Sequence, residues 1–117
     1  MPVSDPDVVD GIGVDQENDT VLMQMTEARD WSDPVAQVRD LQNKTNAYIK
    51  FVSGGQIDEI TAFRGRPIEF QVFFQFLPPA ECNAIFRALE AHLAEMKIRF
   101  RAFHGASLQS PTIDWTQ

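Results

Sequence analysis

The chain has 117 residues, of which 44% are hydrophobic, enough for one domain with its own core. Its single cysteine, Cys82, excludes an internal disulfide, and its apolar stretches are far shorter than the ~20 residues that cross a bilayer. The net charge of -7 at pH 7 disfavours binding to nucleic acid or to anionic membranes. The N-terminal residues lack the pattern of a secretion signal, so we expect a cytoplasmic protein.

The acidity is concentrated near the N-terminus. Residues 1–33 contain nine acidic side chains and one basic one, a balance of -8, whereas residues 34–117 contain eight acidic and nine basic ones, a balance of +1. An acidic region of this kind attracts cationic partners over about 8–10 Å at physiological salt. We therefore predict an acidic partner face in this region, formed by Asp10, Asp15, Glu17 and Asp19.

The first predicted structure is a β-hairpin made of residues 8–14 and 20–26. Apolar residues alternate in both segments, and the polar residues 15–19 form the turn between them. Gly11 and Gly13 weaken the first strand and indicate a bulge or a close approach of two backbones.

The most clearly specified element is a helix that begins near Pro34. Ser32 or Asp33 can cap its first free N–H groups, and proline suits the first turn. Residues on one side recur every three or four positions and predict a single buried face: Val35, Val38, Leu41, Thr45, Tyr48, Ile49 and Val52. Gly54 can adopt the left-handed conformation that ends a helix, and Gly55 permits a sharp turn.

Further strands and a second helix follow. Residues 56–63 predict a short strand, and residues 68–76 predict the clearest strand because apolar and polar residues alternate there. Apolar residues at helical spacing predict a helix over residues 79–97, and alternation resumes in a last strand over residues 98–103.

The predicted order is ββαββαβ, which indicates an α+β fold. Each strand has one apolar face and each helix one apolar stripe, so we expect both helices on one face of a five-stranded, mainly antiparallel sheet. The last six elements have the order of the ferredoxin-like fold, to which we expect a relation, but a reordered five-stranded sheet is equally consistent. We expect a single α+β domain over residues 1–104 and an extended or flexible tail over residues 105–117.

Several motifs in this chain resemble a family of short bacterial proteins carried as a domain of unknown function. The resemblance covers roughly residues 5–104. It rests on Asp-Pro-Asp-Val-Val-Asp at 5–10, Asp-Trp-Ser-Asp at 30–33, Lys-x-Asn-Ala-Tyr at 44–48, Ser-Gly-Gly at 53–55, and residues 74–79. It implies an α+β cytosolic domain and brings no activity, ligand or catalytic residue.

No pattern in the sequence indicates catalysis, a metal site or a cofactor. Asp15, Glu17 and Asp19 resemble the first half of a calcium loop, but Thr20 and Thr26 stand where that loop needs glycine and a bidentate glutamate. The two histidines are isolated, and no serine has the Gly-x-Ser-x-Gly context of a nucleophile. We therefore predict a non-enzymatic protein without a cofactor.

The best candidates for an interface lie on the polar sides of the two clearest strands. Phe73 and Phe103 should share with Arg99 and Arg101 the sheet face that the helices leave uncovered. Aromatic residues mixed with arginine are typical of protein interfaces, including those of self-association. A stacking platform for single-stranded nucleic acid would look similar, but the acidity of the chain argues against it. The remaining alternative is a sheet face that is locally covered by the chain itself.

Three other residues have two possible roles each. Trp31 can staple the chain to the first helix or contact a partner, and we favour the staple. Trp115 can dock on its own domain or anchor in a partner. Cys82 lies on an apolar stripe near a helix start, and we expect it to pack in the core rather than to react.

The leading functional hypothesis is a protein-interaction domain that binds another protein or its own copy. The acidic region would steer a cationic partner, as in immunity proteins that neutralise basic effectors. The alternative is a small-ligand binding domain with a pocket between sheet and helices, for which Arg64, Arg66 and Tyr48 are candidates.

Overall fold

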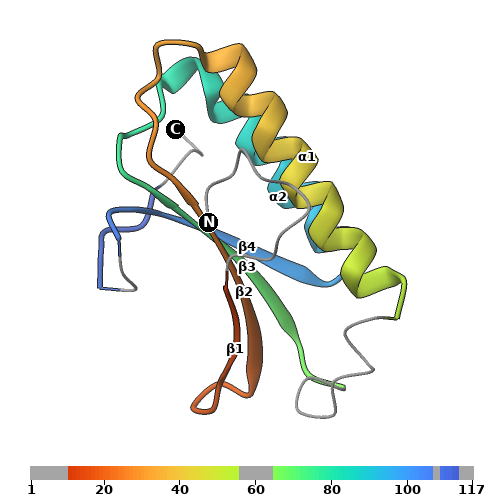
Figure 1. The fold of residues 1–117 in the computed structure, drawn as a ribbon. Helices are drawn as coiled ribbons and strands as arrows, with labels where there is room; N and C mark the ends of the chain where they lie inside the picture. Colours follow the sequence, from red (N-terminus) through yellow and green to blue (C-terminus); the bar gives the residue numbers. More distant parts are fainter. Residues whose placement is uncertain (1–10, 56–64, 107–108, 114–117) are drawn as a thin grey trace.

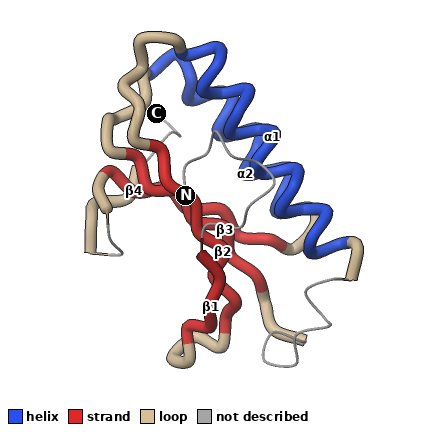
Figure 2. Tube along the Cα trace, viewed as in Figure 1, coloured by secondary structure: helices blue, strands red, loops and turns tan. Residues whose placement is uncertain are grey.

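The computed structural model describes residues 11–55, 65–106 and 109–113. Its elements are, in chain order, β1 (Gly11–Asp15), β2 (Thr20–Glu27), α1 (Pro34–Ser53), β3 (Ile68–Phe74), the 3-10 turn η3 (Ala80–Cys82), α2 (Asn83–Glu95) and β4 (Ile98–His104). Both helices lie on one side of the sheet, as predicted (Figure 1). The described elements therefore form two layers, and none of the described helices covers the other face of the sheet (Figure 2).

The sheet is mixed, and this corrects the prediction of a mainly antiparallel one. Its four described strands have the order β1-β2-β3-β4, in which β1 pairs with β2 antiparallel while β2–β3 and β3–β4 are parallel. Parallel neighbours need a crossover connection, and α1 and α2 provide the two crossovers. The alternation of apolar residues shows which segments are strands but not their direction.

The predicted fifth strand, over residues 56–63, lies outside the described residues. The order of the four described strands does not confirm the predicted relation to the ferredoxin-like fold. The second helix begins later than predicted, because the 3-10 turn at Ala80–Cys82 precedes it. Neither described helix has the length and apolarity that a bilayer crossing requires.

The start of α1 follows from its sequence. A side-chain oxygen of Asp33 accepts a hydrogen bond from the backbone N–H of Ala36 at 3.2 Å, and Pro34 occupies the first turn. At the other end the prediction is corrected, because Gly54 has φ -77° and Gly55, with φ 84°, takes the left-handed conformation. A side chain at Gly54 would still clash, since its Cβ would lie 2.7 Å from the carbonyl oxygen of Lys50.

The core lies between the helices and one face of the sheet. Alternate residues of the three parallel strands point toward the helices and are buried: Val21, Met23, Met25, Phe70, Val72, Phe74, Ile98, Phe100 and Ala102. They pack against Val38, Leu41 and Tyr48 of α1 and against Phe86 and Leu93 of α2. Burying side chains of this size contributes about 1.5–3 kcal/mol each, which makes this layer the main source of stability.

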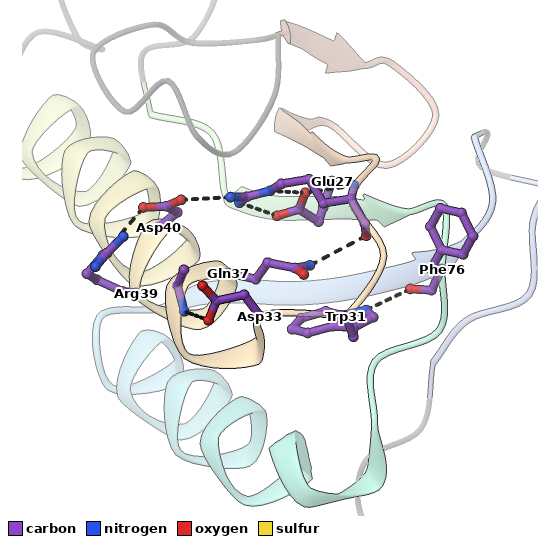
Figure 3. A network of polar contacts seen from close by, with 9 residues as sticks. Glu27, Trp31, Asp33, Gln37, Arg39, Asp40 and Phe76 are labelled. Carbon is purple, nitrogen blue, oxygen red and sulfur yellow. Dashed lines mark hydrogen bonds and ion pairs between the residues drawn. The ribbon is translucent and has the colours of Figure 1, made fainter.

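A polar network fixes the path of the chain from β2 into α1 (Figure 3). Glu27 is 2% exposed and binds Arg29 through both carboxylate oxygens, at 2.9 and 2.7 Å. The third nitrogen of this guanidinium, Nη1, lies 3.0 Å from Asp40 of α1. The hydrogen bond to Glu27 is the main reason that the pKa of Arg29 is raised above its usual value. Arg29 therefore joins a buried carboxylate to the helix.

Trp31 belongs to the same connection and acts as a staple. Its indole N–H donates a hydrogen bond to the carbonyl oxygen of Phe76 at 3.0 Å. Its ring packs against Phe74 and Phe86, with centroid distances of 5.8 and 6.4 Å. These contacts join the entry to α1 with α2 and with the segment that follows β3, whereas the favoured interpretation placed the staple on the first helix. Figure 3 shows the hydrogen bond between Trp31 and Phe76.

The Glu27–Arg29 pair gives a test of this connection. Replacing Arg29 by Leu leaves the Glu27 carboxylate buried without its main partner, and we expect a loss of about 3–5 kcal/mol in the free energy of unfolding. The double variant Glu27→Leu, Arg29→Leu should recover most of that loss. Urea denaturation measures both, with Arg87→Ala at an exposed position of α2 as a control that should change stability by less than about 1 kcal/mol. Equal losses in the single and double variants would contradict the pairing.

Candidate functional site

The helix-free face of the sheet carries three rows of side chains across β2, β3 and β4. The strand register places one residue of each strand in every row: Leu22, Glu69 and Arg99; then Gln24, Gln71 and Arg101; then Thr26, Phe73 and Phe103. The face is therefore polar and charged toward the amino ends of the parallel strands and aromatic toward their carboxyl ends.

The aromatic row differs from the expected open platform. Phe73 and Phe103 stack on one another as neighbours on the predicted face, with ring centroids 5.0 Å apart, but they are only 7% and 1% exposed. Part of the predicted tail lies nearby, because Thr112 pairs with Phe103 and the N–H of Ile113 donates to the carbonyl oxygen of Ala102 at 2.9 Å. Both rings therefore lie on the predicted face of the sheet, but they are buried rather than open to a partner.

The polar rows are organised around Glu69, which is 4% exposed although no helix covers this face. Its carboxylate accepts a hydrogen bond from the side-chain amide of Gln71, which in turn accepts one from the amide of Gln24 at 2.9 Å. Nitrogen atoms of Arg99 and Arg101 lie 3.4 and 3.5 Å from the two Glu69 oxygens. Because a buried carboxylate is costly unless it is paired, these contacts make its burial possible.

A pocket of about 410 Å³ opens over these polar rows. The turn between β1 and β2 forms one side through Asp15 and Asn18, and Arg99 and Arg101 form the other side. The side chain of Asn18 donates to Asp15 at 2.8 Å, and this hydrogen bond is the main cause that lowers the pKa of Asp15. Asp15 is therefore ionised at neutral pH, and the pocket has one negative and one positive side.

The two arginines remain accessible to a ligand. The Arg99 side chain is 73% exposed and the Arg101 side chain 37% exposed. Each guanidinium has five N–H donors, and the contact with Glu69 uses one nitrogen of each. The guanidinium of Arg101 also lies 5.0 Å from the centre of the Phe103 ring, which restricts its orientation. The site thus presents two oriented guanidinium groups, each with further N–H donors that a ligand can bind.

The predicted acidic face is only partly as expected. Glu17 is exposed, but Asp19 forms an ion pair with Arg66, and Asp10 lies outside the described residues. Trp115 also lies outside the described residues, so neither of its predicted roles can be assigned. The acidic character of the turn therefore comes chiefly from Asp15 and Glu17.

The residues of the alternative ligand site serve different parts of the fold. Tyr48 is 1% exposed, packs edge-on against Phe70, and donates its hydroxyl to the carbonyl oxygen of Gln24 at 2.7 Å. Arg66 binds the β1–β2 turn through Asp19, and Arg64 lies outside the described residues. The polar pocket lies instead on the opposite face of the sheet, where Gln24 and Gln71 belong to the same hydrogen-bonded chain as Glu69.

Two other side chains are buried, and the sequence predicted the burial of only one of them. Cys82 is 3% exposed, which confirms core packing, and burial raises the pKa of its thiol. Lys44 is not among the residues of the predicted buried face of α1, yet it is fully buried, with its ammonium 5.6 Å from the centre of the Tyr48 ring. Within the described residues, no group of three or more His, Cys, Asp or Glu side chains could hold a metal ion.

The role of Glu69 can be measured directly. In Glu69→Gln the side chain keeps its shape but loses the charge that holds two guanidiniums, so we expect a loss of about 1–2 kcal/mol in unfolding free energy. The Nε–H resonances of Arg99 and Arg101 should also broaden or shift in NMR spectra. Glu95→Gln, on the exposed end of α2, is the matched control and should leave both unchanged. An unaltered spectrum for Glu69→Gln would contradict the proposed pairing.

Comparison with known proteins gives one finding. The model of DUF6572, a family of unknown function, matches residues 1–105. This agrees with the resemblance seen in the sequence. No curated protein and no solved structure matches the chain.

Proposed function

The chain belongs to DUF6572, a family of unknown function, and we propose that it is a non-enzymatic binding protein that recognises another protein through the helix-free face of its sheet. The observation that carries this proposal is the polar pocket in which buried Glu69 holds Arg99 and Arg101. No activity or ligand is transferred from the family.

A contribution to folding stability does not by itself explain why a buried glutamate is paired with two arginines on this face. A buried ion pair is often no more stabilising than apolar side chains of similar volume, because both charges lose their hydration. On this sheet face, however, Glu69 restricts the positions of two arginines that remain accessible to solvent. Binding sites gain affinity when their charged groups are oriented before the partner arrives. The arrangement is therefore better explained as preparation of a site.

The two sides of the pocket define the partner. Asp15 on one side, with the exposed Glu17 of the adjacent turn beside it, favours a basic group, and Arg99 and Arg101 on β4 favour a carboxylate. Because β1 and β4 are three inter-strand spacings apart, a partner would carry these groups roughly 14 Å from each other. Such a pattern is available on a protein surface, where basic and acidic side chains can be held at a fixed separation.

The net charge of -7 favours a partner that is basic overall. Its long-range attraction would accelerate encounter, and the contacts in the pocket would then select the correct orientation. An immunity-like role, in which an acidic protein neutralises a basic effector, is one form of this proposal. In that form the arginines would contact an acidic group within an otherwise basic surface.

The binding surface can be tested by comparing the wild type with the double variant Arg99→Ser, Arg101→Ser. Tagged protein is used to capture partners from cells that express it, and each candidate is then purified and titrated by calorimetry. We expect the double variant to bind at least about tenfold more weakly, and wild-type affinity to fall with added salt. The double variant Lys50→Ser, Arg87→Ser, at exposed positions of α1 and α2, removes the same charge and is the matched control, which should bind normally. A partner that binds wild type and double variant equally would refute the assigned surface.

A second candidate function is the binding of a small anion. The pocket volume of about 410 Å³ lies within the range of small-molecule sites, and two guanidiniums line it. We expect inorganic phosphate or acetate to shift the Arg99 and Arg101 side-chain resonances in a saturable manner in NMR titrations. The double variant Arg99→Ser, Arg101→Ser should lose saturation. Shifts that rise linearly with concentration, as for unspecific ion binding, would contradict a small-anion site.

A further inference from the structure

A second surface lies on the opposite side of the molecule, in a groove between the beginnings of α1 and α2. The groove has a volume of about 680 Å³ and is mainly apolar. Its apolar side chains include Val35 and Val38 from α1 and Cys82 and Ile85 from the start of α2. The amino-terminal ends of the two helices lie side by side in the upper part of Figure 1.

At the groove, residues of the predicted apolar stripes are exposed rather than buried. Val35 begins the apolar stripe of α1, yet it is 79% exposed, whereas Val38 and Leu41 on the same stripe are buried. Ile85 lies on the predicted stripe of α2 and is 36% exposed. Apolar side chains on a helix stripe gain stability only when another surface covers them. Within the described residues, the monomer leaves this end of both stripes uncovered.

The charges of the groove suit a second copy of the same chain. Arg39 and Glu81 also line it, and they have opposite signs. The Arg39 side chain is 67% exposed, and its contact with Asp40, at 3.7 Å, is longer than the 3.0 Å contact of Arg29 with the same carboxylate. In a two-fold symmetric interface every contact between two different residues occurs twice, once in each direction. Arg39 of each copy can therefore face Glu81 of the other. One chain thus contains both halves of a complementary pair.

We propose that the protein forms a two-fold symmetric dimer through this groove, with Val35 and Ile85 of each copy covered by the other. The proposal is independent of the binding function assigned to the helix-free face. The helices lie on one side of the sheet and the polar pocket on the other, so a dimer leaves both pockets accessible (Figure 1). The dimer would present two equivalent pockets, which strengthens binding to any partner with two matching sites.

Sedimentation velocity over a wide range of protein concentration tests the dimer. The wild type should change from monomer to dimer as concentration rises. Val35→Asp should raise the dissociation constant at least about tenfold, because it places a charge in the centre of an apolar contact. Met96→Asp is the control, since Met96, which follows the end of α2, is also 36% exposed but does not line the groove, and this variant should dimerise like the wild type.

Exchanging the charges of Arg39 and Glu81 distinguishes this interface from a dimer contact elsewhere on the surface. Arg39→Glu and Glu81→Arg should each weaken the dimer about tenfold, because each brings like charges together across the two-fold axis. The double variant Arg39→Glu, Glu81→Arg should restore dimerisation, which an unrelated contact would not do. Circular dichroism and urea denaturation establish that every variant is folded.

Three results would overturn the proposal. A wild type that stays monomeric at all concentrations would show that no second copy occupies the groove, and would leave it to a different protein. A dimer that tolerates Val35→Asp but is lost in Arg99→Ser, Arg101→Ser would place self-association on the helix-free face. A double charge exchange without recovery would exclude the reciprocal Arg39–Glu81 pairing.

Discussion

The parallel pairing of β2, β3 and β4 is the constraint on which the rest of the structure depends. Each parallel connection has to carry the chain back to the start of the next strand, and α1 and α2 make these two returns. Because both returns run over the same side, the core forms there and the opposite face carries no helix (Figure 2). The same topology therefore creates a helix surface and a separate polar sheet surface.

Two buried glutamates show how similar chemistry serves different ends on the two sides of this sheet. Glu27 lies at the end of β2 and binds Arg29, which also contacts α1 through Asp40, so its charge links elements of the fold. Glu69 is nearly as buried, but its arginine partners extend into solvent and line a pocket. The first pair is explained by the connection that it holds. The second has surplus donors, and this surplus makes it a candidate site.

The local parts of the fold were predictable from sequence, whereas the properties that depend on distant residues were not. Asp33 and Pro34 identify the start of α1 because a cap acts within one turn. Alternation placed Phe73, Phe103, Arg99 and Arg101 on one face, but the burial of the aromatic pair depends on how distant parts of the chain pack around it, including the return at Thr112. Strand direction, which decides whether the sheet is mixed, has no local signal of this kind.

The exposed end of the α1 stripe links the sequence pattern to the proposed assembly. Two copies that each carry a net charge of -7 repel one another at long range, so electrostatics alone cannot bring them together. The attraction would have to come from apolar contact, for which Val35 and Ile85 are available, while Arg39 and Glu81 would determine the register at close range. This division of roles explains why an acidic protein would retain an exposed valine beside a charge-balanced groove. It also leaves the acidic turns, and the pockets beside them, directed away from each other and toward a partner.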